Sequence, residues 1–308
     1  MLRALLLSLS ESRGLRRFAE RSRLGQSLSG RFVAGTKSED VLAASQAVNR
    51  AGLSVSIDNL GESVTNAGEA RASAATYHHL LDEISRLQLD ANISLKLTHM
   101  GIDLDEGLAR GLVAGLVAKA AAMSPPNFVR VDMEGSAYTR RTLDLVHELH
   151  GVAGNAGHVG AVIQSYMRSA EADVEHLLAA RIRIRLCKGA YKESAEIAYQ
   201  KKPEVDANYV NLMKRLLKSG VYHGLATHDE KIIRQAREFA LRENIAPDRF
   251  EFQMLYGIRR DLQQALAREG WRMRVYIPFG AEWYPYLMRR LAERPANILF
   301  IAKNLLRK

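Results

Sequence analysis

Polar and ionisable residues recur at the ends of short apolar runs along most of this sequence. Each of them can carry a charge or take part in a hydrogen bond. The set comprises Asp58, Lys96, Asp132, Gln164, Arg185 with Lys188, Thr227 with His228, Tyr256 and Tyr276. Arg289 and Arg290 follow, and two adjacent guanidiniums offer planar forks of donors that suit a carboxylate or a phosphate. These residue types predict a site that grips a small anion.

Other kinds of site find little support in the sequence. Neither a G-x-G-x-x-G dinucleotide fingerprint nor a G-x-x-x-x-G-K-[ST] phosphate loop occurs. The run at 147–150 is one residue short of an H-E-x-x-H zinc motif, so we expect no metal. The basic run at 181–188 reads as a buried strand, so we expect no nucleic-acid partner. A lysine at a strand end, Lys96, leaves a Schiff-base aldolase or lyase open as an alternative.

Eight short runs have the length and composition of β-strands. They span 53–57, 93–97, 128–133, 159–164, 182–187, 221–227, 250–255 and 273–277. Helical patterns fill gaps between them, at 67–88, 103–123, 208–218 and 229–243. The runs begin about 31 residues apart, which fits the ~250 residues of an eight-fold strand–helix barrel. Strands that alternate with helices imply parallel pairing, so we predict an α/β fold of the (β/α)₈ barrel type.

Several of these strands alternate apolar and polar residues. Ser56 and Asp58 share one face of the first strand, Arg130 and Asp132 one face of the third, and the arginines at 181, 183 and 185 one face of the fifth. In a barrel the outer face must meet apolar helices, so the polar face points into the lumen. An antiparallel sheet with one wet face would show the same alternation, but the intervening helices favour the barrel. Both signs of charge occur, so buried ion pairs are expected.

The chain is basic, and its first segment especially so. It has 308 residues and a net charge of +10, and residues 1–31 contain seven arginines against two acids. A basic helix can lie on an anionic membrane, or it can be solvated and packed against the body of the protein. A mitochondrial transit peptide is a third interpretation, whereas a secretory signal and a transmembrane helix are not expected. We expect a helical extension over 1–50, a barrel over 51–308, and a cytoplasmic location with peripheral contact at the inner face of the cell membrane as one option.

A series of motifs in fixed order resembles the proline dehydrogenase family, in particular the bacterial monofunctional members. The motifs are LGE at 60–62, SLKLTHMG at 94–101, VRVDME at 129–134, QSY at 164–166, RLCKGAY at 185–191, ATHD at 226–229, RFEFQMLYG at 249–257 and VYIPFGAEWYPYLMRRLAERP at 275–295. The resemblance implies a distorted (β/α)₈ barrel that binds FAD non-covalently. It also implies oxidation of L-proline to 1-pyrroline-5-carboxylate, with electrons passed to a membrane quinone and a separate 1-pyrroline-5-carboxylate dehydrogenase for the next step.

The resemblance also implies roles for individual residues around the substrate. Arg289, Arg290 and Lys96 would clamp the proline carboxylate, and Asp132 would be the counter-charge of this cationic cluster. The ring of proline would be walled by side chains that exclude water. Those side chains are Tyr276, Tyr286, Tyr191 and Leu186.

A second group of residues would hold the cofactor. Arg185 would lie near flavin N5, and with Asp132 it forms the expected catalytic pair. Lys188 and the backbone of Cys187, Gly189 and Ala190 would meet the phosphate and ribitol region. Gln164, Thr227, His228 and the Met133 backbone would complete the FAD site, and Glu293 would contact the cofactor or fix the last helix. Lys192 and Cys187 depart from the family pattern, which has an aromatic residue and a valine at those places in some relatives.

Overall fold

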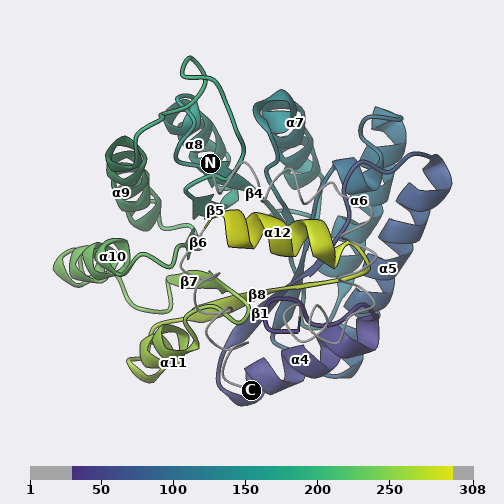
Figure 1. Ribbon diagram of the computed structural model, residues 1–308, viewed down its shortest axis with the longest axis horizontal. Coiled ribbons are helices and arrows are strands. Elements are labelled where there is room, and N and C mark those ends of the chain that lie inside the picture. Colours follow the sequence, from purple (N-terminus) through teal and green to yellow (C-terminus); the bar gives the residue numbers. More distant parts are fainter. Residues whose placement is uncertain (1–29, 294–308) are drawn as a thin grey trace.

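The computed structural model describes residues 30–293, with side chains up to Met288, as a closed barrel of eight parallel strands in sequential order (Figure 1). The strands are β1 (Ser54–Asn59), β2 (Ala91–Leu95), β3 (Val129–Val131), β4 (Val159–Gln164), β5 (Arg183–Cys187), β6 (His223–Ala226), β7 (Phe250–Leu255) and β8 (Met273–Phe279). Pairing of β1 with β8 closes the ring. The predicted fold class is confirmed, and each of the eight expected runs overlaps a strand.

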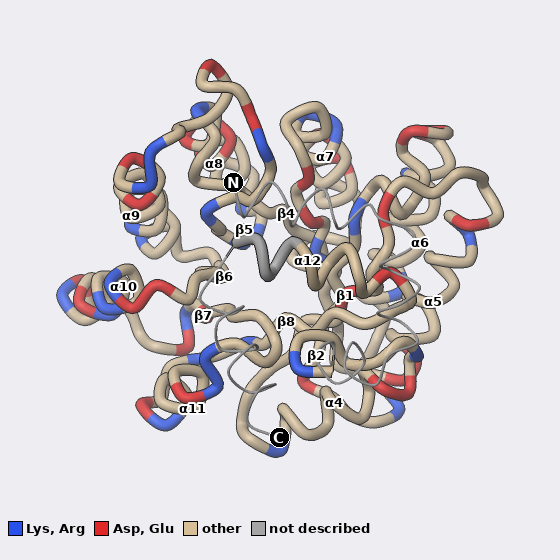
Figure 2. Tube along the Cα trace, in the orientation of Figure 1, with Lys and Arg blue, Asp and Glu red and all other residues tan. Residues whose placement is uncertain are grey.

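Most helices form a ring outside the strands. They are α5 (Ala67–Arg86), α6 (Glu106–Ala122), α7 (Ser136–Gly151), α8 (Ala170–Ala179), α9 (Lys202–Lys218), α10 (Glu230–Arg242) and α11 (Arg260–Arg268). Figure 2 shows Lys and Arg interspersed with Asp and Glu along these outer helices. The helix expected at 208–218 begins earlier, at Lys202. Pro203 in its first turn and a capping interaction through Glu204 favour the earlier start.

Two helices depart from the regular barrel and make it distorted. The segment before β1 forms α4 (Ser38–Arg50), which packs against β8 and β1 on the outside. The helix after β8, α12 (Trp283–Glu293), is drawn across the ring of strands in Figure 1. Its apolar residues cluster with Leu60, which directly follows β1, and with Phe32 and Val33. Thus α4 fills the outer place of an eighth helix, and α12 lies at the carboxyl end of the strands.

Side chains sort to two sides of the sheet by simple alternation. Val55, Ile57, Ile93 and Leu95 are fully buried in the core between strands and helices. Their alternate neighbours are the serines, charged residues and Gln253 of the lumen. A Cβ atom on Gly224 would lie 2.4 Å from the Gln253 Nε2 atom, so the absence of a side chain there leaves room for this lumen residue. The polar lumen inferred from alternation is therefore present.

The floor of the lumen, at the amino ends of the strands, contains a buried ion pair. Arg274 donates from Nε to both carboxylate oxygens of Glu251, at 2.8 and 2.9 Å. Tyr222 and Gln253 donate to the same carboxylate, at 2.9 and 2.6 Å. Burial by itself raises the pKa of Glu251, but the Arg274 charge and these hydrogen bonds outweigh it and lower that pKa to about 2. The carboxylate is therefore ionised and fully engaged.

We expect Glu251→Gln to lower the free energy of unfolding by about 3 kcal/mol at pH 7, because it leaves the buried Arg274 without its counter-charge. Urea unfolding followed by circular dichroism measures this. The matched control is Glu238→Gln, which breaks an exposed pair with Arg234 and is expected to change stability by about 0.5 kcal/mol or less. Equal losses in the two variants would contradict the assignment.

The same pair gives a pH dependence with a definite sign. The pKa of Glu251 is depressed in the folded protein, so its contribution is complete above the ordinary value of 4.5 and is lost as the pH falls toward about 2. The stability difference between wild type and Glu251→Gln is thus expected to shrink across that window. A difference that stayed constant would show that the Glu251 charge is not the cause.

Candidate active site

Arg185 is the centre of a hydrogen-bond network at the carboxyl end of the lumen. Its Nη1 atom donates to Asp132 Oδ1 at 2.6 Å and to Ser94 Oγ at 2.9 Å. Its Nη2 atom donates to Ser56 Oγ at 3.1 Å, and its Nε atom to Gln253 Oε1 at 2.5 Å. One buried guanidinium thus joins β1, β2 and β7 to the residue that follows β3.

Tyr276 completes the environment of the Asp132 carboxylate. Its hydroxyl donates to Asp132 Oδ2 at 2.9 Å, so Asp132 accepts one bond on each oxygen, from Arg185 and from Tyr276. The Arg185 guanidinium lies 5.1 Å from the centre of the Tyr276 ring. Burial and the neighbouring carboxylates of Asp132 and Asp58 raise the pKa of Tyr276 well above its ordinary value. The hydroxyl therefore keeps its proton and remains a donor.

Lys96 follows β2 and has a different acidic partner. Its Nζ atom lies 3.4 Å from Asp58 Oδ2; the Asp58 side chain is buried and that of Lys96 is 12% exposed. Although burial alone lowers the pKa of Lys96, the carboxylates of Asp58, Glu62 and Asp132 outweigh it and raise that pKa above its ordinary value. Lys96 is therefore a protonated cation, suited to bind an anion and unsuited to act as an amine nucleophile.

This pairing differs in detail from the sequence-based expectation. Asp132 was expected to balance Lys96, Arg289 and Arg290, whereas its ion-pair partner in the described structure is Arg185, and that of Lys96 is Asp58. Alternation places the side chains of Asp58, Lys96, Asp132 and Arg185 in the lumen but does not fix which of them form ion pairs. Pairing depends on how the strands are staggered around the barrel.

Arg289, Arg290 and Glu293 belong to α12, and their side chains lie outside the part that the structure describes. Their roles stay predictions. The backbone of α12 nevertheless brings this segment to the carboxyl end of β1, through the contact with Leu60. That is the end at which Lys96 and Arg185 lie.

The predicted cofactor residues on β4 and near β3 form a small polar group. Gln164 donates from Nε2 to the Glu134 carbonyl at 2.9 Å. The Glu134 carboxylate accepts from the Thr98 amide and hydroxyl, at 3.1 and 2.6 Å. Met133 is buried between Asp132 and Glu134 in the chain. These contacts fix Gln164 at the carboxyl end of β4.

Lys188 follows β5 and lies in a charged cluster. Its Nζ atom is 2.6 Å from Asp206 Oδ1 and 2.9 Å from Asp229 Oδ2. Lys202 contacts the same two carboxylates. The cluster holds two cations and two anions, and Asp229 also caps α10. An anion that approaches Lys188 must therefore compete with Asp206 and Asp229.

Gly189 has a backbone conformation that favours glycine, with φ of +108°. A Cβ atom there would lie 2.2 Å from the Tyr166 ring, so residue 189 must pass very close to that ring. The Tyr166 hydroxyl is buried and has no hydrogen-bond partner within the described residues. The Tyr166 ring fills the space beside Gly189, so the unmatched Tyr166 hydroxyl is the group near this loop that calls for a further polar partner.

The remaining predicted residues near β5 and β6 lie at strand ends. The Thr227 hydroxyl accepts from the Asp229 amide at 3.1 Å, and His228 Nε2 accepts from the Leu255 amide at 3.0 Å. Cys187 ends β5 as a partly buried thiol, and Ala190 follows Gly189 in the loop. His228 therefore has a fixed ring orientation next to β7.

The predicted walls of the substrate pocket are placed unequally. Tyr276 lies in the network, and Tyr286 is buried within α12 and its apolar cluster. Tyr191 is 38% exposed in the loop after β5. Leu186 is fully buried in the hydrophobic core, on the face of β5 opposite to Arg185. The described geometry thus groups Tyr276 with Arg185 and does not bring Leu186 to the lumen; the wall roles themselves stay predictions.

Sequence reasoning overlooked three partners of Arg185 and one tyrosine. Ser56 and Ser94 were recognised as lumen residues but not as hydrogen-bond acceptors, and Gln253 was not singled out. All three fall on the polar positions of their strands, so the alternation that located Arg185 could also have located them. Tyr166 lies within the QSY motif, but nothing in the sequence indicates an unmatched hydroxyl.

The fold and the site together place the protein in the class of barrel enzymes. Within residues 30–293, a closed parallel barrel carries its buried mixed-charge network at the carboxyl ends of the strands, where barrel enzymes carry out their chemistry. The same described residues contain no cluster of three metal-ligating side chains and no helix long and apolar enough to cross a membrane.

The chain belongs to the proline dehydrogenase family. The family model described as "Proline dehydrogenase" matches residues 41–303. The chain is 39% identical over 310 residues to "Proline dehydrogenase 1" of Bacillus subtilis subsp. natto, covering 100% of both chains. It is 41% identical over 281 residues to "Proline dehydrogenase" of Deinococcus radiodurans, covering 91% of this chain and 90% of the relative. The family resemblance is thereby confirmed.

Solved structures share the barrel. Proline utilization A from Bdellovibrio bacteriovorus matches with a TM-score of 0.81 and 25% identity over 87% of this chain. A variant of the Bradyrhizobium japonicum protein of the same name matches with a TM-score of 0.75 and 25% identity over 91%. In each case this chain spans only 32% of the larger protein, so it corresponds to one part of it.

A histidine beside the site reports on the Lys96 charge. Burial and the positive charge of Lys96 lower the pKa of His99 to about 4. We expect Lys96→Met to raise the pKa of His99 by about one pH unit, since one of the two main causes is removed. Nuclear magnetic resonance titration of the histidine ring nitrogens measures this.

The control is a second lysine–histidine pair on the outer helices. Burial and the Lys119 charge lower the pKa of His78. Lys119→Met is expected to raise the pKa of His78 and leave that of His99 unchanged. Lys96→Met is expected to raise the pKa of His99 and leave that of His78 unchanged. A His99 titration that Lys96→Met does not move would show that Lys96 is not a charged neighbour of this ring.

Proposed function

We propose that this protein oxidises L-proline to 1-pyrroline-5-carboxylate at the carboxyl end of its barrel, with FAD bound non-covalently as the cofactor. Its membership in the proline dehydrogenase family and the names of its full-length relatives support the substrate. The single observation that carries the proposal is the Arg185 network. It fixes a buried cation, a carboxylate and a protonated tyrosine at the strand ends, next to a second cation, Lys96.

The substrate carboxylate is bound by positive charge. Lys96 is protonated, and its 3.4 Å contact with Asp58 is longer than the 2.6 Å contact between Arg185 and Asp132, so its ammonium would also accept a substrate carboxylate as a partner. Arg289 and Arg290 would add two forks of donors from α12, which fix the orientation of a carboxylate better than a single ammonium does. Asp132 pairs with Arg185 and not directly with Lys96, so substrate binding at Lys96 would not have to displace Asp132.

The substrate ring needs an apolar, dry environment. Tyr276 presents its ring to the lumen with its hydroxyl already bound to Asp132. Tyr286 would cover the ring from α12, and Tyr191 from the loop after β5. Because Tyr191 is 38% exposed, closing this loop over a bound substrate would exclude water from it.

The residues at the ends of β4, β5 and β6 have the chemistry that an FAD molecule requires. FAD supplies the hydride acceptor when it is bound. Arg185 would provide a fixed positive charge that stabilises negative charge on the flavin ring. The unmatched Tyr166 hydroxyl would provide a donor, and the Gly189 backbone would approach the cofactor beside it. The rest of the FAD molecule would be contacted by Gln164, Thr227, His228 and the loop of Cys187, Lys188 and Ala190. Lys188 would then be released from Asp206 and Asp229.

The wider setting is also a proposal. Electrons would pass to a membrane quinone, and the product would be consumed by a separate 1-pyrroline-5-carboxylate dehydrogenase. A cytoplasmic protein with peripheral contact at the cell membrane fits the seven arginines of residues 1–31, most of which lie outside the described part. The salt dependence of binding to anionic vesicles tests this contact.

Anaerobic reduction tests the function directly. We expect the purified, FAD-saturated protein to lose its oxidised-flavin absorbance when L-proline is added without oxygen. L-Alanine, which has the same charges but no ring, is the matched control and is expected to leave the spectrum unchanged. Failure of L-proline to reduce a fully loaded protein would overturn the proposal. Borohydride trapping of a substrate adduct on Lys96 would instead favour the aldolase alternative.

We expect Lys96→Met to lower kcat/KM for L-proline by roughly a hundredfold, mostly through a higher KM, because a buried partner of the carboxylate is lost. Steady-state kinetics with an artificial electron acceptor measure this. Lys119→Met removes the same charge from an outer helix and is expected to keep wild-type kinetics. An unchanged KM in Lys96→Met would remove Lys96 from the clamp.

A further inference from the structure

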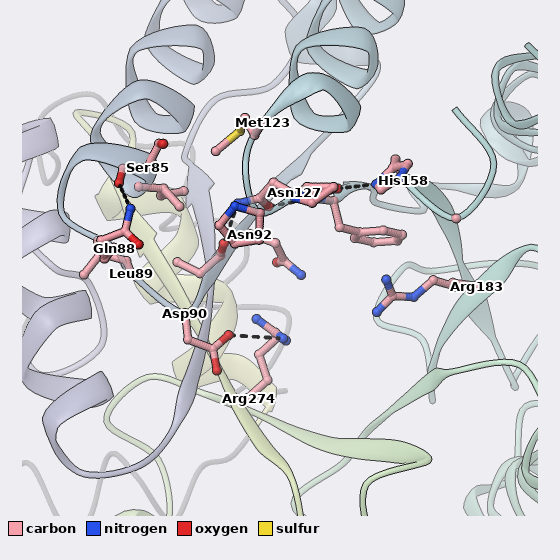
Figure 3. Close-up of a pocket in the computed structure, with 16 residues that line it drawn as sticks. Ser85, Gln88, Leu89, Asp90, Asn92, Met123, Asn127, His158, Arg183 and Arg274 are labelled. Atoms are coloured by element: carbon pink, nitrogen blue, oxygen red, sulfur yellow. Dashed lines mark hydrogen bonds and ion pairs between the residues drawn. The ribbon is translucent and has the colours of Figure 1, made fainter. Parts of the chain in front are cut away.

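A cavity lies at the opposite mouth of the barrel from the candidate active site. Its volume is about 470 Å³, within the range of small-molecule sites. It is formed by the loops that precede β2, β3 and β4 and by the first lumen residues of β5 and β8, Arg183 and Arg274. Figure 3 shows both guanidiniums pointing into the same space, with Asn92 between them. The cavity is therefore a feature of the amino ends of the strands.

Arg183 is the unusual residue of this cavity. Its guanidinium lies over the rings of Phe128 and Tyr222, 4.2 and 4.8 Å from their centres. Its Nε atom is buried and has no hydrogen-bond partner within the described residues. No carboxylate of those residues forms an ion pair with it, and its nearby acid, Glu251, is already bound by Arg274. Two aromatic rings thus hold a cation whose donor edge is not used by the fold.

The charges around the cavity do not balance. Arg130, Arg183 and Arg274 lie at this end of the lumen, and Glu251 is the acid buried among them. Asp90 stands at the rim, with Oδ1 3.9 Å from Arg274 Nη2, but its side chain is 64% exposed. Burial, together with the charges of Arg185 and Arg183, lowers the pKa of Arg130. An anion in the cavity would relieve this repulsion.

The other walls add a neutral polar group and an apolar surface. Asn92 is 8% exposed, lines the cavity, and has an amide oxygen, a hydrogen-bond acceptor, without a partner within the described residues. Ile84, Leu89, Met123 and Phe128 add apolar surface. A bound molecule would therefore need one oxyanion for the arginines and an apolar body for the remaining space.

We propose that this cavity is a second ligand site, which binds a small organic anion that has a carboxylate or phosphate group and a compact apolar body. Arg183 is its main anion-binding residue, held by Phe128 and Tyr222, and Arg274 and Asn92 line the same space. The site is separate from the candidate active site. Arg183 and Arg185 share one face of β5, and the intervening lumen is filled by the Arg185 network.

Titration calorimetry on the full chain tests the site with benzoate and phenyl phosphate as probes. Benzyl alcohol, which has the ring without the charge, is the control ligand. We expect saturable binding of at least one anion with one site per chain and a Kd below about 1 mM, and no binding of benzyl alcohol. The tighter of the two probes identifies the preferred oxyanion. The absence of saturable binding of both anions at 10 mM, about ten times that Kd, would overturn the proposal.

Variants assign the binding to this cavity. Arg183→Gln is expected to raise Kd at least about tenfold, and Arg183→Lys, which keeps the charge but loses the fork, several-fold. Arg272→Gln removes an exposed charge at the same mouth, and Lys96→Met removes a partly buried charge at the opposite mouth. Both variants are expected to change Kd less than about twofold. If Arg183→Gln does not fold, Arg183→Lys decides. Binding that Lys96→Met abolishes and the Arg183 variants leave unchanged would overturn the proposal.

Discussion

The structure depends on one buried interaction, the hydrogen bonding of the Arg185 guanidinium inside the barrel. A charged group in this position is very costly to desolvate unless each of its donors is matched. Here Asp132, Gln253, Ser94 and Ser56 supply the acceptors, from four different parts of the barrel wall. The positions of these groups are therefore interdependent. A displacement of any one strand leaves a buried charge unmatched, so the network keeps the site rigid.

The same constraint explains how one lumen supports two distinct ends. At the carboxyl end the charges are paired nearly one to one, Arg185 with Asp132 and Lys96 with Asp58. At the amino end the Arg274–Glu251 pair leaves Arg130 and Arg183 without acidic partners of their own within the described residues. Arg130 is held by the carbonyls of Ala161 and Arg183, but the donor edge of the Arg183 side chain has no such use. Pairing within the fold accounts for the charges of Arg185 and Lys96 at the carboxyl end, but not for the charge of Arg183 at the amino end.

Sequence reasoning reached the barrel, its strands and its polar lumen, because these follow from local alternation along single strands. Ser56, Asp58, Arg130 and Arg185 all lie where alternation places them. It could not assign the ion-pair partners. Strand stagger decides that Asp132 pairs with Arg185 and that Lys96 pairs with Asp58. The cofactor and substrate roles came from motif resemblance. Confirmation of the family supports those roles, but geometry alone supports them unequally, as the core position of Leu186 shows.

The positions of α4 and α12 differ from those of the helices in a regular barrel, and this difference places α12 at the active site. In a regular barrel the last helix would pack outside β8, and the carboxyl mouth would be lined by loops alone. Here α4 packs there against β8 and β1, so α12 is free to lie at the mouth with Tyr286 and the backbone of Arg289 and Arg290. Its described side chains form an apolar cluster with Phe32, Val33 and Leu60 that is distinct from the main hydrophobic core. The segment that carries the predicted carboxylate clamp is thus positioned by Phe32, Val33 and Leu60, which are separate from the residues of the Arg185 network.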